Sequence, residues 1–207
     1  MRASRRLILA GLAATALGLG LGASTAGARV AVRPDDMVLG SPSAKVIVME
    51  YASVTCPHCA AWHETVYPAF KRKYVDTGKV RYVFRELPTY PQAEATGGFL
   101  VARCAGKTGF FKVVADLMAD QPAFYGDMDG PAWLVRAGAK SGMSRQKVLA
   151  CAGDRKALAA FNARTEANAA ADKVNSTPTF FVNGKRLANA ELSDLDAAIA
   201  PLLAGQR

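Results

Sequence analysis

The sequence predicts an α/β fold in which a block of helices is inserted between two groups of strands. First, the apolar and β-branched stretch KVIVMEYAS is followed by CPHC and then by a helical pattern. Second, the alanine-rich region from about residue 91 to 173 contains few β-branched runs. Third, Asn183-Gly184 separates two extended runs, which is a strong signal for a hairpin turn. Strands on both sides of a helical region favour one domain with an insertion.

The first half of the predicted sheet consists of strands joined by a helix. Residues 45–53 form a continuous apolar run, which is typical of a strand buried on both faces. The segment VRYVFREL alternates and predicts a second strand, which a strand–helix–strand unit makes parallel to the first. A short strand is expected at residues 37–39. An amphipathic helix kinked at Pro68 is predicted between the two long strands from apolar residues spaced four apart: Trp62, Val66, Phe70 and Tyr74.

The alanine-rich region is expected to form four or five helices. Glycine or proline separates its short apolar segments, and the longer RKALAAFNARTEANAAADKV ends it. After it, STPTFFVNGKRL predicts a hairpin that extends the same sheet. Ser193 is expected to cap a final helix that runs from about Asp194 to Leu203.

Residues 1–28 are typical of a cleaved export signal. Arginines precede an apolar, glycine-rich stretch, no acidic residue is present, and an Ala-Gly-Ala cleavage motif ends at Ala28. A membrane-anchoring helix is the alternative, but the stretch is short for a bilayer of about 30 Å. The arginine pair after Ser4 is compatible with twin-arginine export, so the export route stays open. The mature domain then comprises residues 29–207.

The formal net charge of +9 does not by itself indicate a nucleic-acid-binding protein. The basic residues are spread out apart from a mild cluster in KRKYVDTGKVR, and no basic stripe is interleaved with aromatic residues. A solvated surface with some attraction to acidic partners explains this charge better. No binding of nucleic acid is therefore expected, and the chemistry of the chain is expected to lie in its cysteines.

The motif CPHC lies where a strand is predicted to pass into a helix. Free backbone N–H groups and the helix dipole favour a thiolate at a helix N-terminus, so Cys56 is expected to be the nucleophile. Cys59 lies one turn further in and is expected to be the buried, resolving thiol. Pro57 suits the first helical position, and His58 can stabilise the thiolate by a hydrogen bond or a positive charge. A stabilised thiolate makes the disulfide a stronger oxidant.

Two other roles for these cysteines have to be weighed. Cys56, Cys59 and His63 supply three metal ligands, but a structural zinc site needs four, and the sequence has no second CxxC. His63 is then expected to be a polar residue on the helix surface. A purely structural Cys56–Cys59 bond would close a very short loop and constrain the unfolded chain little. No metal or organic cofactor is therefore expected.

A second motif, Thr177-Pro178 before an apolar strand, accompanies CPHC. Proline is tolerated at the start of a strand, and a trans bond is the ordinary expectation there. The two motifs together resemble the thioredoxin superfamily and, within it, the DsbA-like periplasmic thiol–disulfide oxidoreductases. The resemblance extends from about Asp36 to Leu203. It implies a thioredoxin-like fold with an inserted all-helical subdomain at about residues 91–173.

The resemblance also implies a reaction. Cys56 matches the attacking cysteine, Cys59 matches the buried one, and Pro57 and His58 match the pair that tunes strongly oxidising members. The implied reaction is donation of the Cys56–Cys59 disulfide to reduced exported proteins through a mixed disulfide. The implied reoxidant is a membrane quinone-linked partner, and the implied location is the periplasm.

Three residues outside CPHC also match positions with a role in the family. Pro178 matches the cis-proline that faces the active site. Thr177 matches the residue whose backbone contacts the bound peptide. Glu50, six residues before Cys56, matches a buried acid that helps proton transfer to the resolving cysteine. The alternative for Glu50 is a strand-end carboxylate exposed to water.

The remaining cysteines, Cys104 and Cys151, lie in the predicted helical region. An oxidising compartment and an even number of cysteines favour a structural bridge between them. In the chain-entropy model a bridge closing a loop of about fifty residues stabilises by about 4 kcal/mol. The alternative is a pair of small, buried apolar residues.

Other functions remain open besides that of a disulfide donor. A disulfide isomerase or reductase would use the same motif, but family isomerases usually carry a separate dimerisation domain. Only a short segment precedes the first predicted strand here, so a monomeric oxidase is favoured. A thiol metal-binding module is the alternative from another class, and it would depend on His63.

Overall fold

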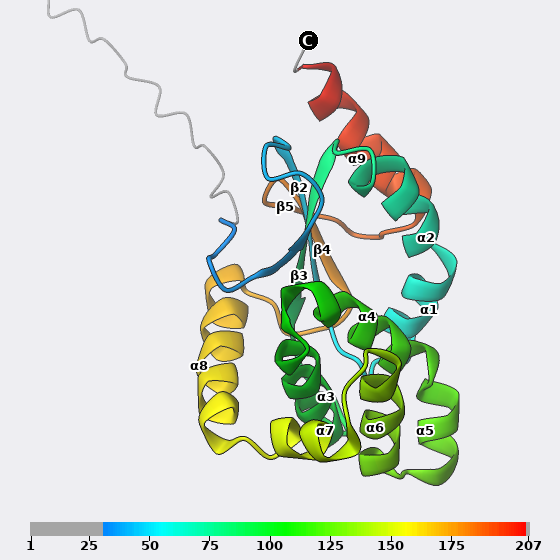
Figure 1. Cartoon of the computed structure of the whole chain (residues 1–207). Coiled ribbons are helices and arrows are strands. Elements are labelled where there is room, and N and C mark those ends of the chain that lie inside the picture. Colours follow the sequence, from blue (N-terminus) through cyan, green and yellow to red (C-terminus); the bar gives the residue numbers. More distant parts are fainter. Residues whose placement is uncertain (1–30, 206–207) are drawn as a thin grey trace, which may run out of the picture.

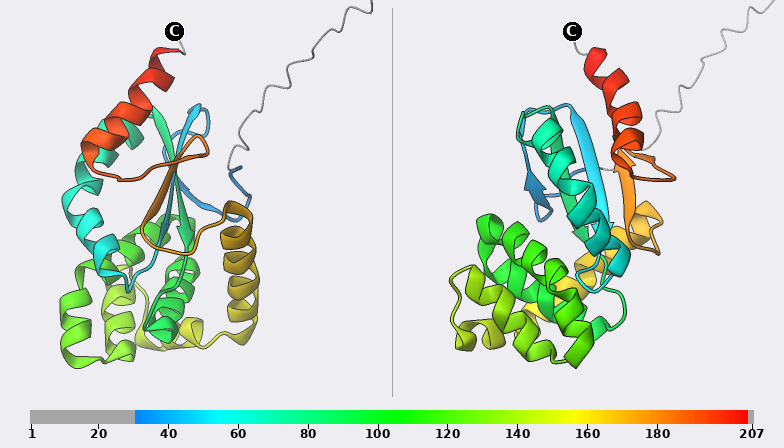
Figure 2. Two further views of the ribbon diagram at one scale, coloured as in Figure 1. Left: turned by 180° about the vertical axis from the view of Figure 1, so that it is seen from behind. Right: turned by 90° about the vertical axis from the view of Figure 1, so that its right-hand side faces the viewer.

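The structure of the chain is a computed structural model that describes residues 31–205, so the predicted export signal at residues 1–28 lies outside the described residues. Figure 1 shows a twisted sheet at one end of the molecule and a group of helices at the other. The rear and side views of Figure 2 show the same division. Within the described range, none of the helices combines the length and the apolar character that a bilayer crossing needs.

The sheet has five strands in the order β1-β3-β2-β4-β5. Strands β2 and β3 are parallel, and the pairs β1–β3, β2–β4 and β4–β5 are antiparallel. The parallel pair and the short strand at residues 37–39 confirm the sequence prediction. The strands are β1 (Met37–Leu39), β2 (Val46–Ala52), β3 (Val80–Glu86), β4 (Thr179–Val182) and β5 (Lys185–Arg186).

The polypeptide between β2 and β3 is mostly helical from Pro57 to Val75, but the type of helix changes along it. The predicted kink is confirmed: α1 (Pro57–Thr65) is interrupted at its C-cap Val66, and α2 (Tyr67–Phe70) continues into the π-helical turn η1 (Lys71–Val75). Pro68 causes the break because it has no N–H to donate to the preceding turn. Two aromatic side chains of the predicted apolar stripe, those of Phe70 and Tyr74, remain buried against the sheet.

The helical block, α3 to α8, connects β3 to β4. It contains six helices, so the prediction of four or five was wrong. The sequence signal was blurred where one helix follows another directly: only Ala105 lies between α3 and α4, which begins at Gly106 with a φ of +75°, and only Asp120 lies between α4 and α5, which has Pro122 in its first turn. The helices are α3 (Gln92–Cys104), α4 (Gly106–Ala119), α5 (Gln121–Asp127), α6 (Gly130–Lys140), α7 (Arg145–Ala152) and α8 (Arg155–Asp172).

The chain returns to the sheet through the predicted hairpin, with Asn183 and Gly184 both at positive φ. The final helix is α9 (Leu192–Ala204). Its cap is Glu191 and not Ser193, so that prediction was wrong. Glu191 and Asp194 form a reciprocal capping box in which each side chain accepts a hydrogen bond from the other residue's backbone N–H. This box starts the helix two residues earlier than a serine cap would.

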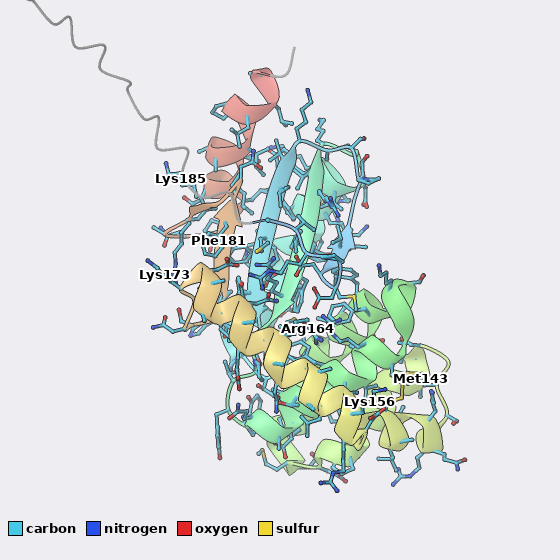
Figure 3. All side chains as sticks on the ribbon, turned by 90° about the vertical axis from the view of Figure 1, so that its left-hand side faces the viewer. Met143, Lys156, Arg164, Lys173, Phe181 and Lys185 are labelled. Carbon is cyan, nitrogen blue, oxygen red and sulfur yellow. A yellow bond between two sulfur atoms is a disulfide. The ribbon has the colours of Figure 1, made fainter. Side chains whose placement is uncertain are left out.

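The two faces of the sheet are covered differently. Helices α1, α2 and α9 pack on one face, and their apolar core continues into the helical block. The opposite face has a smaller core around Met49, Val83 and Phe181, beside the C-terminal end of α8. Figure 3 shows α8 running from the helical block toward β4 along this side of the molecule, with Arg164 near its middle.

Candidate active site

The CPHC motif forms the first turn of α1, as the sequence predicts. Cys56 is the N-cap residue in an extended conformation, and Pro57 occupies the first helical position. The backbone N–H of Cys59 donates to Sγ of Cys56 at 3.3 Å. Both cysteines are free thiols in the structure, which therefore describes the dithiol form. Cys59 is fully buried, whereas Cys56 retains slight exposure.

The environments of the two sulfurs push their pKa values apart. The pKa of Cys56 is lowered to about 6, and the largest cause is the hydrogen bond with the side chain of Cys59. Hydrogen bonds with Thr177 and with the backbone N–H groups of Cys59 and His58 lower it further, whereas burial acts in the opposite direction. Burial, followed by the hydrogen bond and the charge of Cys56 and the charge of Glu50, raises the pKa of Cys59. At neutral pH the pair therefore exists as a Cys56 thiolate beside a Cys59 thiol.

The helical block holds the loop that leads into CPHC. The amide of Gln121 donates to the carbonyl oxygen of Val54 at 2.7 Å and to that of Cys56 at 3.2 Å. The hydroxyl of Tyr125 donates to the carbonyl oxygen of Thr55 at 2.5 Å. Both side chains belong to α5, so this helix satisfies the backbone of the loop and fixes the position of the reactive sulfur.

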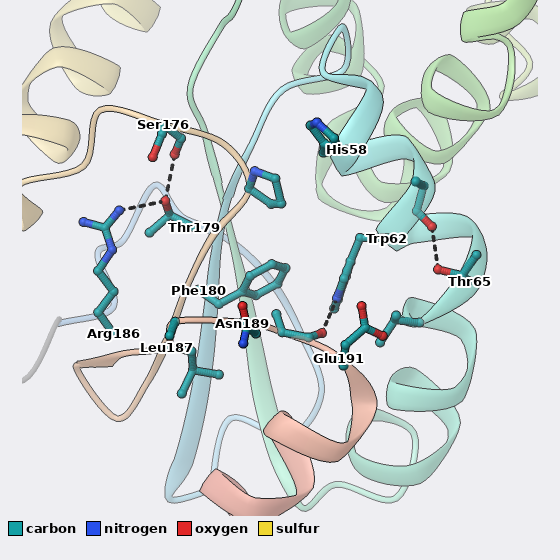
Figure 4. A pocket seen from close by; sticks show the side chains of 15 residues that line it. His58, Trp62, Thr65, Ser176, Thr179, Phe180, Arg186, Leu187, Asn189 and Glu191 are labelled. Carbon is teal, nitrogen blue, oxygen red and sulfur yellow. Dashed lines mark hydrogen bonds between the residues drawn. The ribbon is translucent and has the colours of Figure 1, made fainter.

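The Thr177-Pro178 segment lies directly against Cys56, although the two are 121 residues apart in sequence. Sγ of Cys56 is 3.6 Å from the carbonyl oxygen of Thr177, and the Thr177–Pro178 peptide bond is cis. The next residue, Thr179, donates through its hydroxyl to the carbonyl oxygen of Ser176 at 2.8 Å. Figure 4 shows this contact together with the hydrogen bond from Arg186 to Thr179.

A cavity of about 730 Å³ opens beside the CPHC turn (Figure 4). His58 and Trp62 line one side, and Pro178, Phe180 and the segment before α9 line the other. The indole N–H of Trp62 donates to the carbonyl oxygen of Ala190 at 2.7 Å, which joins the two sides at the base. The imidazole of His58 is exposed and lines this cavity. The contribution of His58 to the lowered pKa of Cys56 comes from its backbone N–H and not from the imidazole.

Glu50 is fully buried under α1, so the alternative of a water-exposed carboxylate was wrong. Nε2 of His63 lies 3.2 Å from Oε1 and 3.1 Å from Oε2 of this carboxylate, and the hydroxyl of Tyr82 donates to Oε2. The side chain of His63 is only 8% exposed, so its predicted place on the helix surface was also wrong. A buried carboxylate needs partners, and α1 supplies one while β3 supplies the other.

The second pair of cysteines lies away from this site. Cys104, the last residue of α3, and Cys151 in α7 are joined by a disulfide, with their Cα atoms 6.1 Å apart. Between residues 31 and 205, no group of three or more His, Cys, Asp or Glu side chains is arranged to hold a metal ion.

Comparisons with known proteins agree with this geometry. A family model described as thioredoxin matches residues 33–200. This chain belongs to the thioredoxin family. The structure of alpha-DsbA1 from Wolbachia pipientis superposes with a TM-score of 0.77 at 25% identity, covering 84% of this chain and 94% of that one. BdbD from Bacillus subtilis superposes with a TM-score of 0.73 at 20% identity, covering 82% and 94% of the two chains, which supports the fold.

Sequence relatives point the same way. A Rickettsia bellii protein named "Putative protein-disulfide oxidoreductase" is 35% identical over 167 residues, which cover 80% of this chain. The matched region spans 63% of that relative's length. The expected thioredoxin-like fold with an inserted helical subdomain and the resemblance to DsbA-like proteins are both confirmed.

Sequence reasoning missed several residues of the site. Gln121 and Tyr125 lie in the least specific part of the chain, and no local pattern identifies them as anchors of the CPHC loop. His63 carried a usable signal. Glu50 interrupts an apolar strand and needs a partner, and His63 is one helical turn after Cys59. That spacing places an imidazole on the turn that faces the strand.

Proposed function

We propose that this protein is a DsbA-like dithiol oxidase, a protein-disulfide oxidoreductase that donates its Cys56–Cys59 disulfide to reduced proteins. The observation that supports this most directly is the stabilised Cys56 thiolate. Hydrogen bonds at the start of α1 lower its pKa to about 6. Stabilising the thiolate stabilises the dithiol form, so the disulfide form readily accepts electrons.

In the proposed reaction a substrate thiolate attacks Sγ of Cys56 in the disulfide form. The Cys56–Cys59 bond breaks, its electron pair passes to Cys59, and a mixed disulfide joins Cys56 to the substrate. A proton reaches Cys59, whose raised pKa favours the thiol. A second substrate thiolate then attacks the substrate sulfur and expels Cys56 as a thiolate. The substrate leaves with a disulfide, and the enzyme remains as the dithiol in which the structure describes it.

The cavity beside CPHC suits an extended polypeptide as the substrate. The carbonyl oxygen of Thr177 lies within reach of Cys56, and Pro178 forms part of the wall. A peptide that forms a mixed disulfide with Cys56 would therefore lie against the backbone of this segment. His58 and Trp62 bound it on the other side. In this proposal Pro57 and His58 tune the thiolate, and Thr177 and Pro178 position the substrate.

The proposed substrates are exported proteins, because residues 1–28 have the features of a cleaved export signal. The proposed location is the periplasm. The proposed reoxidant is a membrane quinone-linked partner, by analogy with DsbA-like proteins, and the proposed active form is a monomer. In such an oxidising compartment the Cys104–Cys151 disulfide would persist and cross-link the helical block.

Parallel assays of two activities on the purified mature chain test this function. We expect rapid formation of a disulfide in a reduced two-cysteine peptide and little rearrangement of a scrambled, multiply bridged protein. The Cys104→Ala/Cys151→Ala variant should retain the oxidation rate, since that bridge lies outside the cavity. Efficient rearrangement with slow oxidation would identify an isomerase instead and contradict the proposal.

A further inference from the structure

The ion pair between Glu50 and His63 is buried beneath the resolving cysteine. Glu50 is fully buried, and the side chain of His63 is 8% exposed. Nε2 of His63 contacts both carboxylate oxygens, at 3.2 and 3.1 Å. Because an ionised carboxylate only accepts hydrogen bonds, Nε2 carries a proton and donates it toward Glu50. A proton on Nε2 of His63 therefore already points at the Glu50 carboxylate.

Tyr82 fixes the other side of the carboxylate. Its hydroxyl donates to Oε2 of Glu50, and the ring is completely buried in the sheet. Burial, followed by the charge of Glu50, raises the pKa of Tyr82. Tyr82 therefore remains protonated at neutral pH and acts as a permanent donor. Of the two partners of Glu50, only His63 ordinarily gains and loses a proton near neutral pH.

The pair lies between Cys59 and a second cavity. The charge of Glu50 contributes to the raised pKa of Cys59, so the carboxylate and the thiol influence one another across the core. On its other side His63 lines a cavity of about 630 Å³ between α1 and the helical block. This cavity is distinct from the one beside Pro178, since its walls include Tyr67, Met118 and Tyr125. His63 is thus the member of the pair that reaches a route to water.

We propose that His63 is a positioning residue that carries protons between Glu50 and water in this second cavity, so that Cys59 can gain and lose its proton during disulfide exchange. This inference rests on the proposed oxidase function. When the Cys56–Cys59 bond breaks, the His63 imidazolium gives its Nε2 proton to the Glu50 carboxylate, and the Glu50 carboxyl group so formed passes the proton to the Cys59 thiolate. Water in the cavity then protonates His63 again.

The reverse transfer serves reoxidation. After Cys56 has formed a mixed disulfide with an oxidant, Cys59 must lose its proton before it can attack Sγ of Cys56. The proton passes to Glu50 and then through His63 to water. Cys59 forms the new bond with Cys56, and the oxidant's sulfur leaves as a thiolate with the electron pair. No further electron donor or acceptor is needed.

The other titratable groups around His63 do not provide this path. Tyr82 and Tyr67 have pKa values that burial raises, and both stay protonated. Tyr125 shares the second cavity, but its hydroxyl is engaged by the loop before CPHC. Glu64 follows His63 on α1 and lines the same cavity, but its exposed side chain makes no hydrogen bond or ion pair within residues 31–205. Glu64 therefore provides a matched control.

The test compares His63→Gln with Glu64→Gln in the mature chain. Glutamine can still donate a hydrogen bond to Glu50, but it cannot carry a proton. Each protein is reduced at Cys56 and Cys59 and mixed with oxidised glutathione, and the decay of the glutathione–Cys56 mixed disulfide is followed by acid quenching and mass spectrometry. We expect His63→Gln to slow this decay about tenfold or more at neutral pH. The deficit should close at alkaline pH, where hydroxide deprotonates Cys59 directly.

A second variant guards against an effect of misfolding. His63→Ala opens the space of an imidazole beside the second cavity, so added imidazole should restore part of the decay rate in this variant and leave Glu64→Gln and the unaltered protein unchanged. An unaltered pH profile in His63→Gln, or no rescue of His63→Ala by imidazole, would overturn the proposal. If the unaltered protein itself fails to oxidise dithiols, the proposed function fails and not only the relay.

Discussion

The two faces of the sheet each bury a cluster of charged groups, but the clusters are built differently. On the face under α1, Glu50 pairs with His63 beneath the reactive thiols. On the opposite face, the Nε and Nη2 atoms of Arg85 donate to the two carboxylate oxygens of Asp36 at 2.9 and 2.8 Å. Arg85 also donates to Asp172 at the end of α8. The first cluster is held by a histidine that lines the second cavity, whereas the second is held by an arginine that is only 1% exposed.

The Glu50–His63 cluster is therefore suited to proton transfer, whereas the Arg85 cluster is suited to holding secondary-structure elements together. Arginine keeps its charge at any pH a protein meets, and its planar fork matches a carboxylate. The Arg85 cluster joins β3, the N-terminal segment and α8, so it ties the helical block to the sheet. Histidine changes its charge near neutral pH. Substitutions in the Arg85 cluster should therefore mainly lower stability, whereas substitutions in the Glu50–His63 cluster should mainly change the chemistry of the thiols.

The largest effect is expected from Cys56→Ser. This change removes the sulfur that a substrate thiolate attacks, so disulfide donation should fall to background. The serine still fits the N-cap of α1, so stability at about pH 6 should remain similar. Oxidation of a reduced two-cysteine peptide and chemical denaturation measure the two quantities. Residual turnover well above background would show that Cys56 does not form the mixed disulfide with the substrate.

Among the substitutions considered, Arg85→Met should cause the largest loss in the free energy of unfolding. It leaves Asp36 and Asp172 buried without their cation, which costs about 3–5 kcal/mol. Urea denaturation would measure the loss, and Lys112→Met, which removes an exposed pair with Asp116, should cost less than about 0.5 kcal/mol. The thiolate titration of Cys56 should not move in either variant. A shift of that titration in Arg85→Met would mean that the two faces are coupled.

Compared with Arg85→Met, Glu50→Gln should have a smaller effect on stability and a larger effect on the pKa of an active-site cysteine. The amide oxygen still accepts hydrogen bonds from His63 and Tyr82, so the stability loss should be about 1–3 kcal/mol, smaller than for Arg85→Met. The charge of Glu50 raises the pKa of Cys59, so the pKa of Cys59 should fall in the variant. Alkylation of Cys59 as a function of pH measures this shift. A rise in the pKa, or none, would contradict the arrangement described.

The pH dependence of stability gives a smaller effect with a definite sign. The pKa of Cys56 is about 6 in the folded dithiol form and ordinarily 9.0, so between these values the unfolded chain binds more protons at this residue. The contribution of Cys56 should therefore stabilise the dithiol form increasingly from pH 6 to 9, by at most about 1.4 kcal/mol per pH unit. The difference between the dithiol protein and Cys56→Ser isolates this contribution. A difference that shrinks over this range would contradict the assignment of the thiolate.

Much of the fold was predictable because its signals are local. The apolar run of β2, the CPHC turn, the proline kink and the Asn-Gly hairpin each depend on residues close together in the sequence. The contacts that complete the site are not local. Gln121 reaches the CPHC loop from α5, and only the packing of the helical block places it there. The cap of α9 was misassigned although its signal is local, because Glu191 and Asp194, three residues apart, form a capping box that starts the helix before Ser193.

The measurement that tests the account most directly is the redox equilibrium of the Cys56–Cys59 pair against glutathione, combined with the thiolate absorbance titration of Cys56. We expect a potential far more oxidising than the roughly −270 mV of thioredoxin. The thiolate should titrate at a pKa of about 6. A thioredoxin-like potential with an ordinary pKa for Cys56 would contradict the assignment of an oxidase and identify a reductase.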